Sequence, residues 1–405
     1  MTAKTYRQFS RWLYTFRLVR SWNDAIAHHL RNLPFNSEIL GAPKGVYLST
    51  RDWFQGLAKP TDASYREVGQ HLPLPRPLPK SLESSLHWKF RRVYEQNQKS
   101  PPLFVAQVPQ GRVWNDSAVI APDDRLLGDV SFEFGKNPDE LTIFRKWKLR
   151  PAYSIQGTVA LLTVPGGLNY YHWMCDLLPR LELIRRSGVE WKAIDRFIVN
   201  STRLPFQQQT LAHLGIPLEK VIESEQVPHI KADRLLVPSL FKEPNAFACD
   251  FLRSTFLTQE MRSKTGAERI YVTRAGARYR HLLNEAEVIH HLTQRGFQVL
   301  QLESMTVAEQ VTAFAHAKWI VAPHGASLTN LAFCQPGTKL VELFSPNYVN
   351  ICFWMMSHAV NIDYAYVIGE GKRPPEFVYR PVPTPYRDNM TIPVNALLKI
   401  LDNLE

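Results

Sequence analysis

Apolar runs that alternate with turn residues dominate the second half of the chain. An apolar run bounded by Pro323 and Gly325 precedes a segment that permits a helix, and a second apolar run covers 340–344. This pattern predicts a strand, a tight loop, a short helix and a strand, which is half of a parallel α/β unit. Ligands of such sheets bind at the carboxyl ends of the strands, so we expect a ligand site in the loop after Val321.

The same alternation continues on both sides of this unit. Strands are expected at 196–199, 221–222, 235–237, 269–273, 297–302 and 362–368. Helices are expected at 207–214, 246–265, 284–295, 306–316, 350–359 and 394–404. In the helix at 306–316, Thr306 and Glu309 have the spacing of a capping box. The order of these elements is typical of doubly wound α/β halves.

The first part of the chain has a different pattern. Residues 40–110 are rich in proline, which predicts a loop or linker and no helix. Short apolar runs at 103–106, 118–121 and 159–164 alternate with Gly, Asn and Asp. We therefore expect β-rich structure that leads into the first α/β half.

Residues 1–20 carry five basic side chains and no acidic one, and apolar residues recur among them at three- and four-residue spacing. This is the pattern of an amphipathic helix. Such a helix either lies on an anionic membrane or docks on the body of the protein with its basic face in water. The sequence leaves both alternatives open.

Length and charge narrow the class of protein. The chain has 405 residues, enough for two or three domains, and 48 basic against 37 acidic side chains give a net charge of +11. A positive chain suits an acidic or phosphorylated ligand, a membrane surface or a nucleic acid. Charge alone does not choose among them.

The four cysteines show no Cys-x-x-Cys spacing and lie in apolar surroundings, which predicts reduced thiols and a reducing compartment. The sequence also contains neither an apolar run of eighteen residues nor the apolar core of a signal peptide. We expect a soluble cytoplasmic protein, with peripheral contact at the inner face of the membrane through residues 1–20 as one option.

A candidate acid/base pair follows the paired glycines at 166–167. Asn169 is a good helix N-cap, and His172 and Asp176 stand four residues apart, hence on one helix face. A carboxylate beside an imidazole can move a proton. The alternative is a histidine that only bonds its helical neighbour.

Candidate phosphate ligands gather in the second half. Arg274, Arg278 and Arg280 follow a predicted strand in a Gly-containing loop, which suits bidentate phosphate contacts, although a solvated basic loop has the same composition. Gly325 permits close backbone approach to a ligand. The amides of residues 326–328 would be free at a helix N-terminus and would favour an anion.

Several nucleotide-binding motifs are absent from the sequence. It has no P-loop, no Gly-x-Gly-x-x-Gly fingerprint, no zinc-spaced His/Cys set and no Asp-x-Asp. This argues against a P-loop ATPase and a standard dinucleotide enzyme. The absence of Asp-x-Asp also argues against a metal ion that this motif would hold on a nucleotide diphosphate.

In order and spacing, several short motifs together resemble the family 61 glycosyltransferases, over roughly residues 100–400. The motifs are Asn169 to Asp176, Leu178 to Leu181, Arg274 to Glu285, Glu309-Gln310, His324-Gly-Ala with Asn330, and Val341-Glu-Leu343. Bacterial members are often labelled capsular polysaccharide biosynthesis proteins. The resemblance implies an α/β GT-B fold, in which two Rossmann-like halves face a cleft, here with a β-rich N-terminal extension.

The resemblance also implies an organisation of the chain. The four parts are an N-terminal basic segment and Pro-rich linker at 1–100, an acceptor-side α/β domain at 101–260, a nucleotide-sugar-binding Rossmann-like domain at 261–390 and a C-terminal helix at 391–405.

Site roles are carried over from the resemblance residue by residue. Arg274 and Arg280 would clamp the donor diphosphate, His324 with the amides of Gly325 and Ala326 would cradle it, and Glu342 would accept hydrogen bonds from the ribose. Asn284 and Glu285 would brace the arginine loop, and Asn169 and Asn330 are further supporting residues. His172 or Asp176 would be the base that takes the proton of the acceptor hydroxyl, with the other as its orienter.

The implied activity is inverting, metal-independent transfer of a sugar from a nucleotide sugar to a polysaccharide or to a glycan or lipid-linked acceptor, with no cofactor. Positive side chains and a helix N-terminus would replace the cation. The alternatives are a catalytically silent nucleotide- or carbohydrate-binding module and a basic nucleic-acid binder. Because the arginines of 180–405 are scattered, we expect no nucleic-acid partner.

Overall fold

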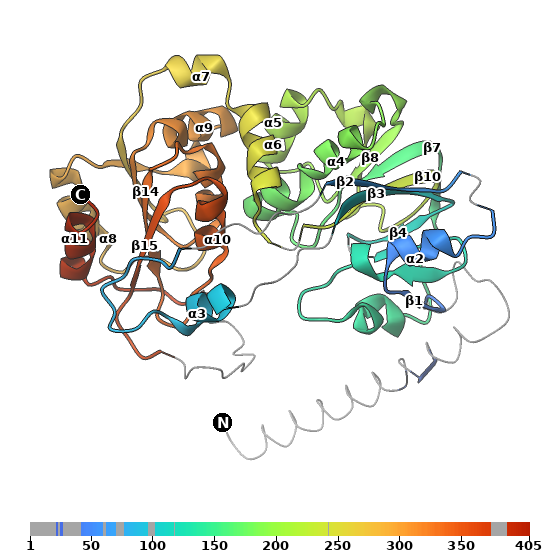
Figure 1. The fold of residues 1–405 in the computed structure, drawn as a ribbon, viewed down its shortest axis with the longest axis horizontal. Coiled ribbons are helices and arrows are strands. Elements are labelled where there is room, and N and C mark those ends of the chain that lie inside the picture. Colours follow the sequence, from blue (N-terminus) through green and yellow to red (C-terminus); the bar gives the residue numbers. More distant parts are fainter. Residues whose placement is uncertain are drawn as a thin grey trace.

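The computed structural model describes residues 42–59, 62–69, 77–95, 102–116, 118–241, 243–373 and 387–405, together with Trp22, Ala25 and Ile26. These residues form two α/β halves, each built on its own β-sheet (Figure 1). The amphipathic helix predicted for residues 1–20 lies outside the described residues. Within them, no helix is both long and apolar enough to cross a membrane.

The second half is built on a five-stranded parallel sheet in the order β12-β11-β13-β14-β15. Its strands are β11 (Arg269–Val272), β12 (Gln298–Leu300), β13 (Trp319–Pro323), β14 (Lys339–Phe344) and β15 (Asp363–Ile368). All residues of β13 are buried, as expected for a parallel strand covered on both faces. The winding reverses between β11 and β13, which makes this edge the switch point of the sheet.

The helices of this half agree with the predicted alternation. They are α8 (Glu285–Gln294), α9 (Val307–His316), the 3-10 helix η8 (Ala326–Phe333), α10 (Cys352–Ala359) and α11 (Val394–Asp402). The capping box of α9 is confirmed, because Thr306 accepts from the Glu309 N–H and Glu309 accepts from the Thr306 N–H.

The first half has a mixed ten-stranded sheet, with β10 near its centre. Its strands are β1 (Gly45–Tyr47), β2 (Ser64–Gly69), β3 (Leu103–Pro109), β4 (Arg112–Trp114), β5 (Ala118–Ile120), β6 (Arg125–Leu127), β7 (Tyr153–Leu161), β8 (Arg196–Val199), β9 (Val221–Glu223) and β10 (His229–Pro238). The order β10-β7-β8-β9 is parallel, and the other pairings are antiparallel except that of β1 with β6. The β-rich structure predicted around 103–165 is confirmed, and the winding of the parallel part reverses between β7 and β10.

Two predictions about helices were wrong. Residues 40–110 contain α2 (Thr50–Gln55) and α3 (Trp88–Glu95), because Trp53 and Phe90 are buried in tertiary contacts that proline content does not reveal. The helix expected at 246–265 is two helices, α6 (Ala246–Phe256) and α7 (Gln259–Ser263). Thr258 starts α7 by accepting a hydrogen bond from the Met261 N–H.

Residues 77–95, the crossing segment, leave the first sheet and pack on the second half. Lys80 pairs with Ala365 of β15 in an isolated parallel bridge. The ring of Phe90 stacks on Tyr366, with centroids 4.8 Å apart, and meets Trp354 edge-on at 5.4 Å. The chain then returns to the first sheet at β3, so β2 and β3 are neighbours on either side of this excursion.

Apolar packing joins the two halves. One hydrophobic cluster contains Trp173 and Leu177 of the first half together with Phe333 and Trp354 of the second. Helices α5 (Pro205–His213) and α6 lie between the two sheets (Figure 1), and α6 contacts η8 and α10. A shared core of this kind holds the halves in one arrangement.

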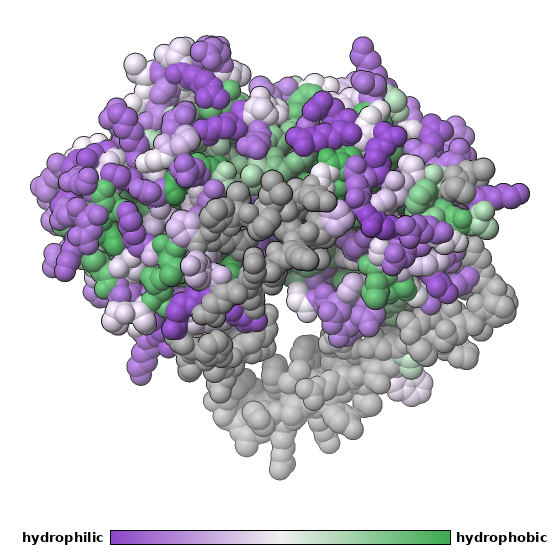
Figure 2. All heavy atoms as spheres, viewed as in Figure 1, coloured by the Kyte–Doolittle hydropathy of each residue, from purple (hydrophilic) through white to green (hydrophobic). Residues whose placement is uncertain are grey.

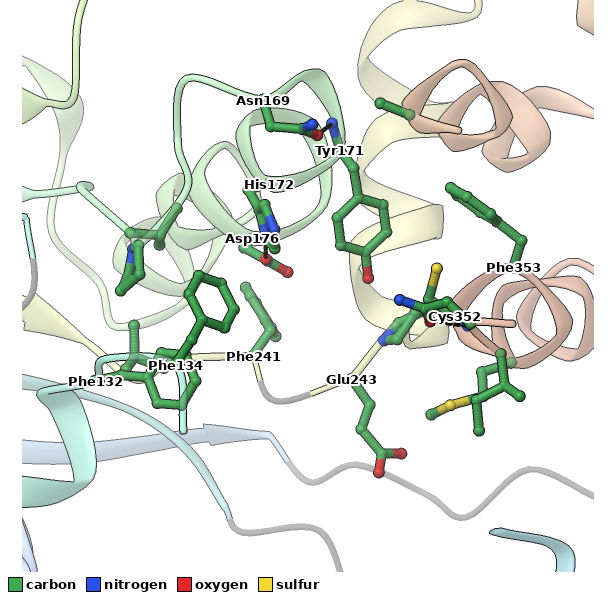
Figure 3. Close-up of a pocket in the computed structure, with 18 of the residues that line it drawn as sticks. Phe132, Phe134, Asn169, Tyr171, His172, Asp176, Phe241, Glu243, Cys352 and Phe353 are labelled. Carbon is green, nitrogen blue, oxygen red and sulfur yellow. Dashed lines mark hydrogen bonds and ion pairs between the residues drawn. The ribbon is translucent and has the colours of Figure 1, made fainter. Parts of the chain in front are cut away.

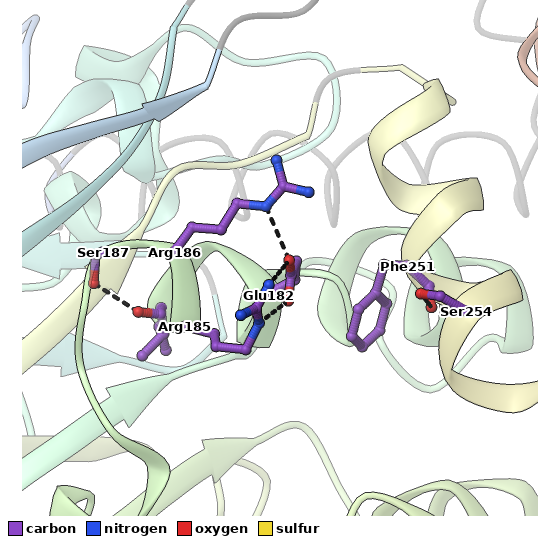
Figure 4. Close-up of polar contacts among 7 residues, drawn as sticks. Glu182, Arg185, Arg186, Ser187, Phe251 and Ser254 are labelled. Atoms are coloured by element: carbon purple, nitrogen blue, oxygen red, sulfur yellow. Dashed lines mark hydrogen bonds and ion pairs between the residues drawn. The ribbon is translucent and has the colours of Figure 1, made fainter.

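The outer surface is polar. On the face seen in Figure 2, hydrophilic side chains cover most of both halves, and apolar residues form small separate patches. Helix α4 (Arg180–Arg186) illustrates this, since it buries Leu181 and Ile184 and turns Glu182 toward two arginines (Figure 4). Such exposed pairs add little stability, so the apolar face fixes the helix.

Candidate active site

A cavity of about 940 Å³ lies where the switch points of both sheets meet. Residues that follow β7 and β10 line it from the first half, and residues that follow β11 and β13 line it from the second. In open α/β sheets, ligands bind outside the carboxyl ends of strands at such points. The cavity therefore has the position of a ligand site in both halves at once.

His172 and Asp176 lie together on the first-half wall (Figure 3). His172 Nδ1 is 2.7 Å from Asp176 Oδ2. The segment is the π-helix η4 (His172–Leu177), and the chain restarts as α4 at Pro179. Asn169 accepts a hydrogen bond from the Tyr171 N–H at 2.9 Å, which is how an N-cap holds the first turn.

The first residue of the paired-glycine loop, Gly166, has to be glycine for two reasons. Its φ of +80° is in the left-handed region, and a Cβ there would lie 2.7 Å from His172 Cδ2. The imidazole therefore packs directly on the backbone of Gly166. This contact fixes the ring from the side opposite to the bond with Asp176.

Opposing effects act on the pKa of the Asp176 carboxyl group. Burial raises the pKa of its carboxyl group, whereas the hydrogen bond from His172 and the positive charge of Arg180 lower it. Arg180 is fully buried and donates to the carbonyl oxygens of Thr163 and Pro238, each at 2.6 Å. Burial lowers the pKa of Arg180 to about 9, so this cation stays protonated near neutral pH.

The second-half wall contains Arg280, His324, Gly325 and Ala326. Arg280 stands between two aromatic rings, 5.1 Å from the centroid of Tyr279 and 5.3 Å from that of Tyr348.

Arg274 does not line the cavity but lies against Gly325. A Cβ on Gly325 would overlap Arg274 Nη1. The φ of Gly325 is 178°, which any residue adopts, so the arginine and not the backbone conformation requires glycine here. The group that approaches Gly325 closely is thus a side chain of the protein itself, and the close approach of a ligand stays a prediction.

Burial disfavours the charged forms of Arg274 and Arg280. Burial, and then the charge of Arg280, lower the pKa of Arg274 to about 10, and burial lowers the pKa of Arg280. Arg274 Nη2 donates to the Tyr279 carbonyl at 3.0 Å, but its buried Nε has no hydrogen-bond partner among the described residues. An anion at this wall would stabilise both cations.

Glu342 lies beneath His324 and outside the cavity. Its carboxylate is fully buried, with Oε1 2.5 Å from His324 Nδ1 and Oε2 accepting from the Tyr364 hydroxyl at 2.6 Å. Both oxygens are thus engaged within the protein, which does not fit the predicted ribose contact. The position instead suits orientation of His324, whose pKa is lowered chiefly by burial.

The supporting residues act behind the walls. Glu285 Oε1 accepts from the Tyr271 and Thr273 hydroxyls, each at 2.8 Å, at the start of the arginine loop. Asn284 exchanges hydrogen bonds with the backbone of Ile392. Asn330 accepts from the Tyr170 hydroxyl at 2.9 Å and so links the two halves.

The backbone amide of Leu328, one of the predicted anion ligands, already has a hydrogen-bond partner. The Leu328 N–H donates to the Gly325 carbonyl at 3.0 Å, because η8 winds as a 3-10 helix. The prediction that the amide of Leu328 is free was wrong. Of the residues at the start of η8, Ala326 lines the cavity.

Sequence reasoning missed other residues of the cavity. Phe132 and Phe134 line it from the loop after β6, Glu243 lines it after β10, and Tyr348 lines it after β14. Phe132 and Phe134 are unusual because they are 40% and 61% exposed. Their alternation around Glu133 resembles an ordinary strand pattern, so the sequence held no signal of this exposure.

Comparison with known proteins bears on this site. Residues 170–341, less than half of the chain, match the family model described as Glycosyltransferase 61. The match begins beside His172 and ends at Val341, so it contains His172, Asp176, both arginines and the turn at His324.

A second similarity is shorter. The chain is 35% identical over 60 residues to beta-1,2-xylosyltransferase RCN11 of Oryza sativa subsp. japonica, which covers 15% of this chain and 11% of that protein. The α/β architecture with its parallel sheet fits an α/β glycosyltransferase fold. Both similarities are to glycosyltransferases, and each covers only part of this chain.

Proposed function

We propose that this chain is an inverting glycosyltransferase of GT-B architecture, which moves a sugar from a nucleotide diphosphate sugar to a hydroxyl of a polysaccharide or other glycoconjugate. The observation that carries the proposal is the opposition of two walls in one cavity. His172 and Asp176 stand on one wall, and Arg280 and His324 stand on the other. Surface polysaccharide biosynthesis is the role suggested by the family resemblance.

In this proposal the second-half wall binds the donor diphosphate. Arg280 and His324 contact the phosphoryl oxygens, and Arg274 adds positive charge from behind Gly325. As the bond between the anomeric carbon and the diphosphate breaks, negative charge grows on the leaving phosphate, and the fixed cations stabilise it. These charges take the part of a metal ion, so the reaction is proposed to need none.

The first-half wall activates the acceptor. Asp176 holds Nδ1–H of His172, which leaves Nε2 as the proton acceptor of the ring. His172 then takes the proton of the acceptor hydroxyl while its oxygen attacks the anomeric carbon from the face opposite the diphosphate. That direction of attack inverts the configuration.

The first experiment measures thermal stabilisation by UDP, GDP, CDP and ADP, since a nucleotide that binds the folded state raises Tm. We expect one of them to stabilise the chain with and without EDTA. Arg280→Ala should abolish the shift, whereas His172→Ala should retain it. A shift of equal size in Arg280→Ala would remove the assignment of the donor wall.

The second experiment separates an enzyme from a silent binding module. Release of nucleotide from the matching nucleotide sugars is followed for the wild type, His172→Ala and Asp176→Asn. Loss of a general base costs roughly 10²- to 10⁴-fold in rate, and Asp176→Asn should lose less than His172→Ala. Equal rates in all three proteins would favour the silent module.

A further inference from the structure

Two exposed phenylalanines form an apolar surface at the cavity, on the wall that also carries His172 and Asp176. The rings of Phe132 and Phe134 meet edge to face with centroids 5.2 Å apart. Phe134 also lies 5.6 Å from the ring of His172. Figure 3 shows both phenylalanines on the side of His172 and Asp176, away from Cys352 and Phe353 of the second half.

The loop that carries these rings is fixed from behind. Glu133, between the two phenylalanines, accepts hydrogen bonds from the Thr142 N–H at 2.9 Å and from its hydroxyl at 2.5 Å. Its other oxygen lies 2.5 Å from Lys136 Nζ. Ser131 Oγ accepts from the Val119 N–H at 2.9 Å. The polar anchors therefore hold the two rings at the cavity in a preformed arrangement.

Exposed aromatic rings of this kind call for an explanation. Leaving a large apolar side chain in water forgoes the stabilisation that its burial would give. An apolar surface that a protein keeps exposed within a pocket commonly marks a ligand contact. The donor charges lie on the other wall, so these rings border the acceptor side of the cavity.

We propose that Phe132 and Phe134 are a stacking platform for a sugar ring of the acceptor, adjacent to the hydroxyl that His172 deprotonates. This inference rests on the proposed function and names the chemistry of its acceptor. A pyranose has a face of C–H groups that packs on an aromatic ring and a rim of hydroxyls that need polar partners. The cavity offers both, since His172 and Asp176 stand beside the rings and Asn169 and Glu243 line the same cavity.

An acyl chain would require a different site. It buries best in an enclosed apolar channel, where no polar group loses its water. Here the rings stay 40% and 61% exposed, and an imidazole and carboxylates share the cavity with them. A ring with one apolar face and a polar rim fits these surroundings, whereas a lipid tail does not.

The test measures oligosaccharide binding by the full chain with saturation-transfer NMR in the presence of UDP. The probes are xylotetraose, cellotetraose and chitotetraose, with sodium decanoate as an acyl probe. We expect saturation of the ring protons of at least one oligosaccharide. Phe134→Ala should weaken its binding roughly ten-fold and Phe132→Ala by less, as expected when a stacking contact is lost.

Two variants serve as controls. Phe134→Trp keeps a flat apolar face and should retain binding. Trp147→Ala removes an aromatic side chain that is 46% exposed and does not line the cavity, and it should change nothing.

Three results would overturn the platform: no oligosaccharide bound by the wild type, unchanged affinity in both alanine variants, or loss of decanoate binding alone in those variants. A different measurement, the thermal shift with nucleoside diphosphates, tests the proposed function itself. If no nucleoside diphosphate raises Tm while the oligosaccharide binding still depends on Phe134, the transferase is excluded and the sugar platform stands.

Discussion

At the scale of single residues, the cavity depends on close contacts that only particular side chains allow. His172 packs on Gly166, and Arg274 packs on Gly325. Gly325 has a backbone conformation that any residue can adopt. Glycine is required there because a larger side chain would occupy the space of the Arg274 guanidinium. Gly325 therefore contributes to the second-half wall of the cavity by leaving room for the Arg274 guanidinium.

Gly325→Ala should displace Arg274 and weaken nucleotide binding by ten-fold or more, because the added methyl group would overlap the guanidinium. The extended backbone accepts alanine, so we expect the protein to fold. Titration with the stabilising nucleoside diphosphate, followed by calorimetry, measures the effect. Gly45→Ala is the matched control, since nothing lies within 4 Å of its added Cβ. Normal affinity in Gly325→Ala would contradict the role given to Arg274.

At the scale of elements, the features that could be predicted from the sequence are those that depend on local sequence pattern. The strands β11, β13, β14 and β15 are continuous apolar runs with turn residues between them, and the His172–Asp176 pair followed from helical spacing alone. Helix α3 escaped prediction because its partners, Tyr366 and Trp354, lie far away in the sequence. The exposure of Phe132 and Phe134 also depends on tertiary structure, so no spacing rule reveals it.

The crossing segment should make stability depend on pH. Burial, followed by the charges of Lys89, Arg373 and Arg91, lowers the pKa of His87 to about 4. The unfolded chain binds this proton more tightly, with a pKa of about 6.5, so stability is fully present above pH 6.5 and falls as the pH drops toward 4. Partial exposure limits the loss to roughly 1–2 kcal/mol.

Urea unfolding of the wild type and of His87→Gln between pH 4 and 7 measures this contribution. The variant should lose that part of the pH dependence. His290→Gln, at an exposed position of α8, should keep it. Identical slopes for wild type and His87→Gln would contradict the role of His87.

At the scale of the whole molecule, the halves behave as one body because they share a core and a buried polar link. Tyr170 of the first half donates to Asn330, whose amide group also donates to Gln310 and to the Ser327 carbonyl. Asn330 is fully buried, so each of these bonds replaces water that cannot reach it. These bonds link the two halves beneath the cavity.

Tyr170→Phe should destabilise the protein by roughly 1–3 kcal/mol, because Asn330 Oδ1 would be left buried without its donor. Urea unfolding should still show one transition for both halves, since one hydrophobic cluster spans them. Tyr153→Phe, at a side chain 59% exposed, is the control and should cost little. Two separate transitions in the wild type would contradict a shared core.

The excursion of residues 77–95 has a consequence for biosynthesis. The His87 N–H donates a hydrogen bond to the Tyr366 hydroxyl, and the two residues are 279 positions apart. The ribosome therefore synthesises helix α3 long before the residues on which it packs. Until β14 and β15 emerge, the nascent chain carries Phe90 exposed, and β2 and β3 must pair across an undocked loop. Translation must therefore pass β15 before the crossing segment can dock, and residues 77–95 are the stretch that a chaperone would shield in the meantime.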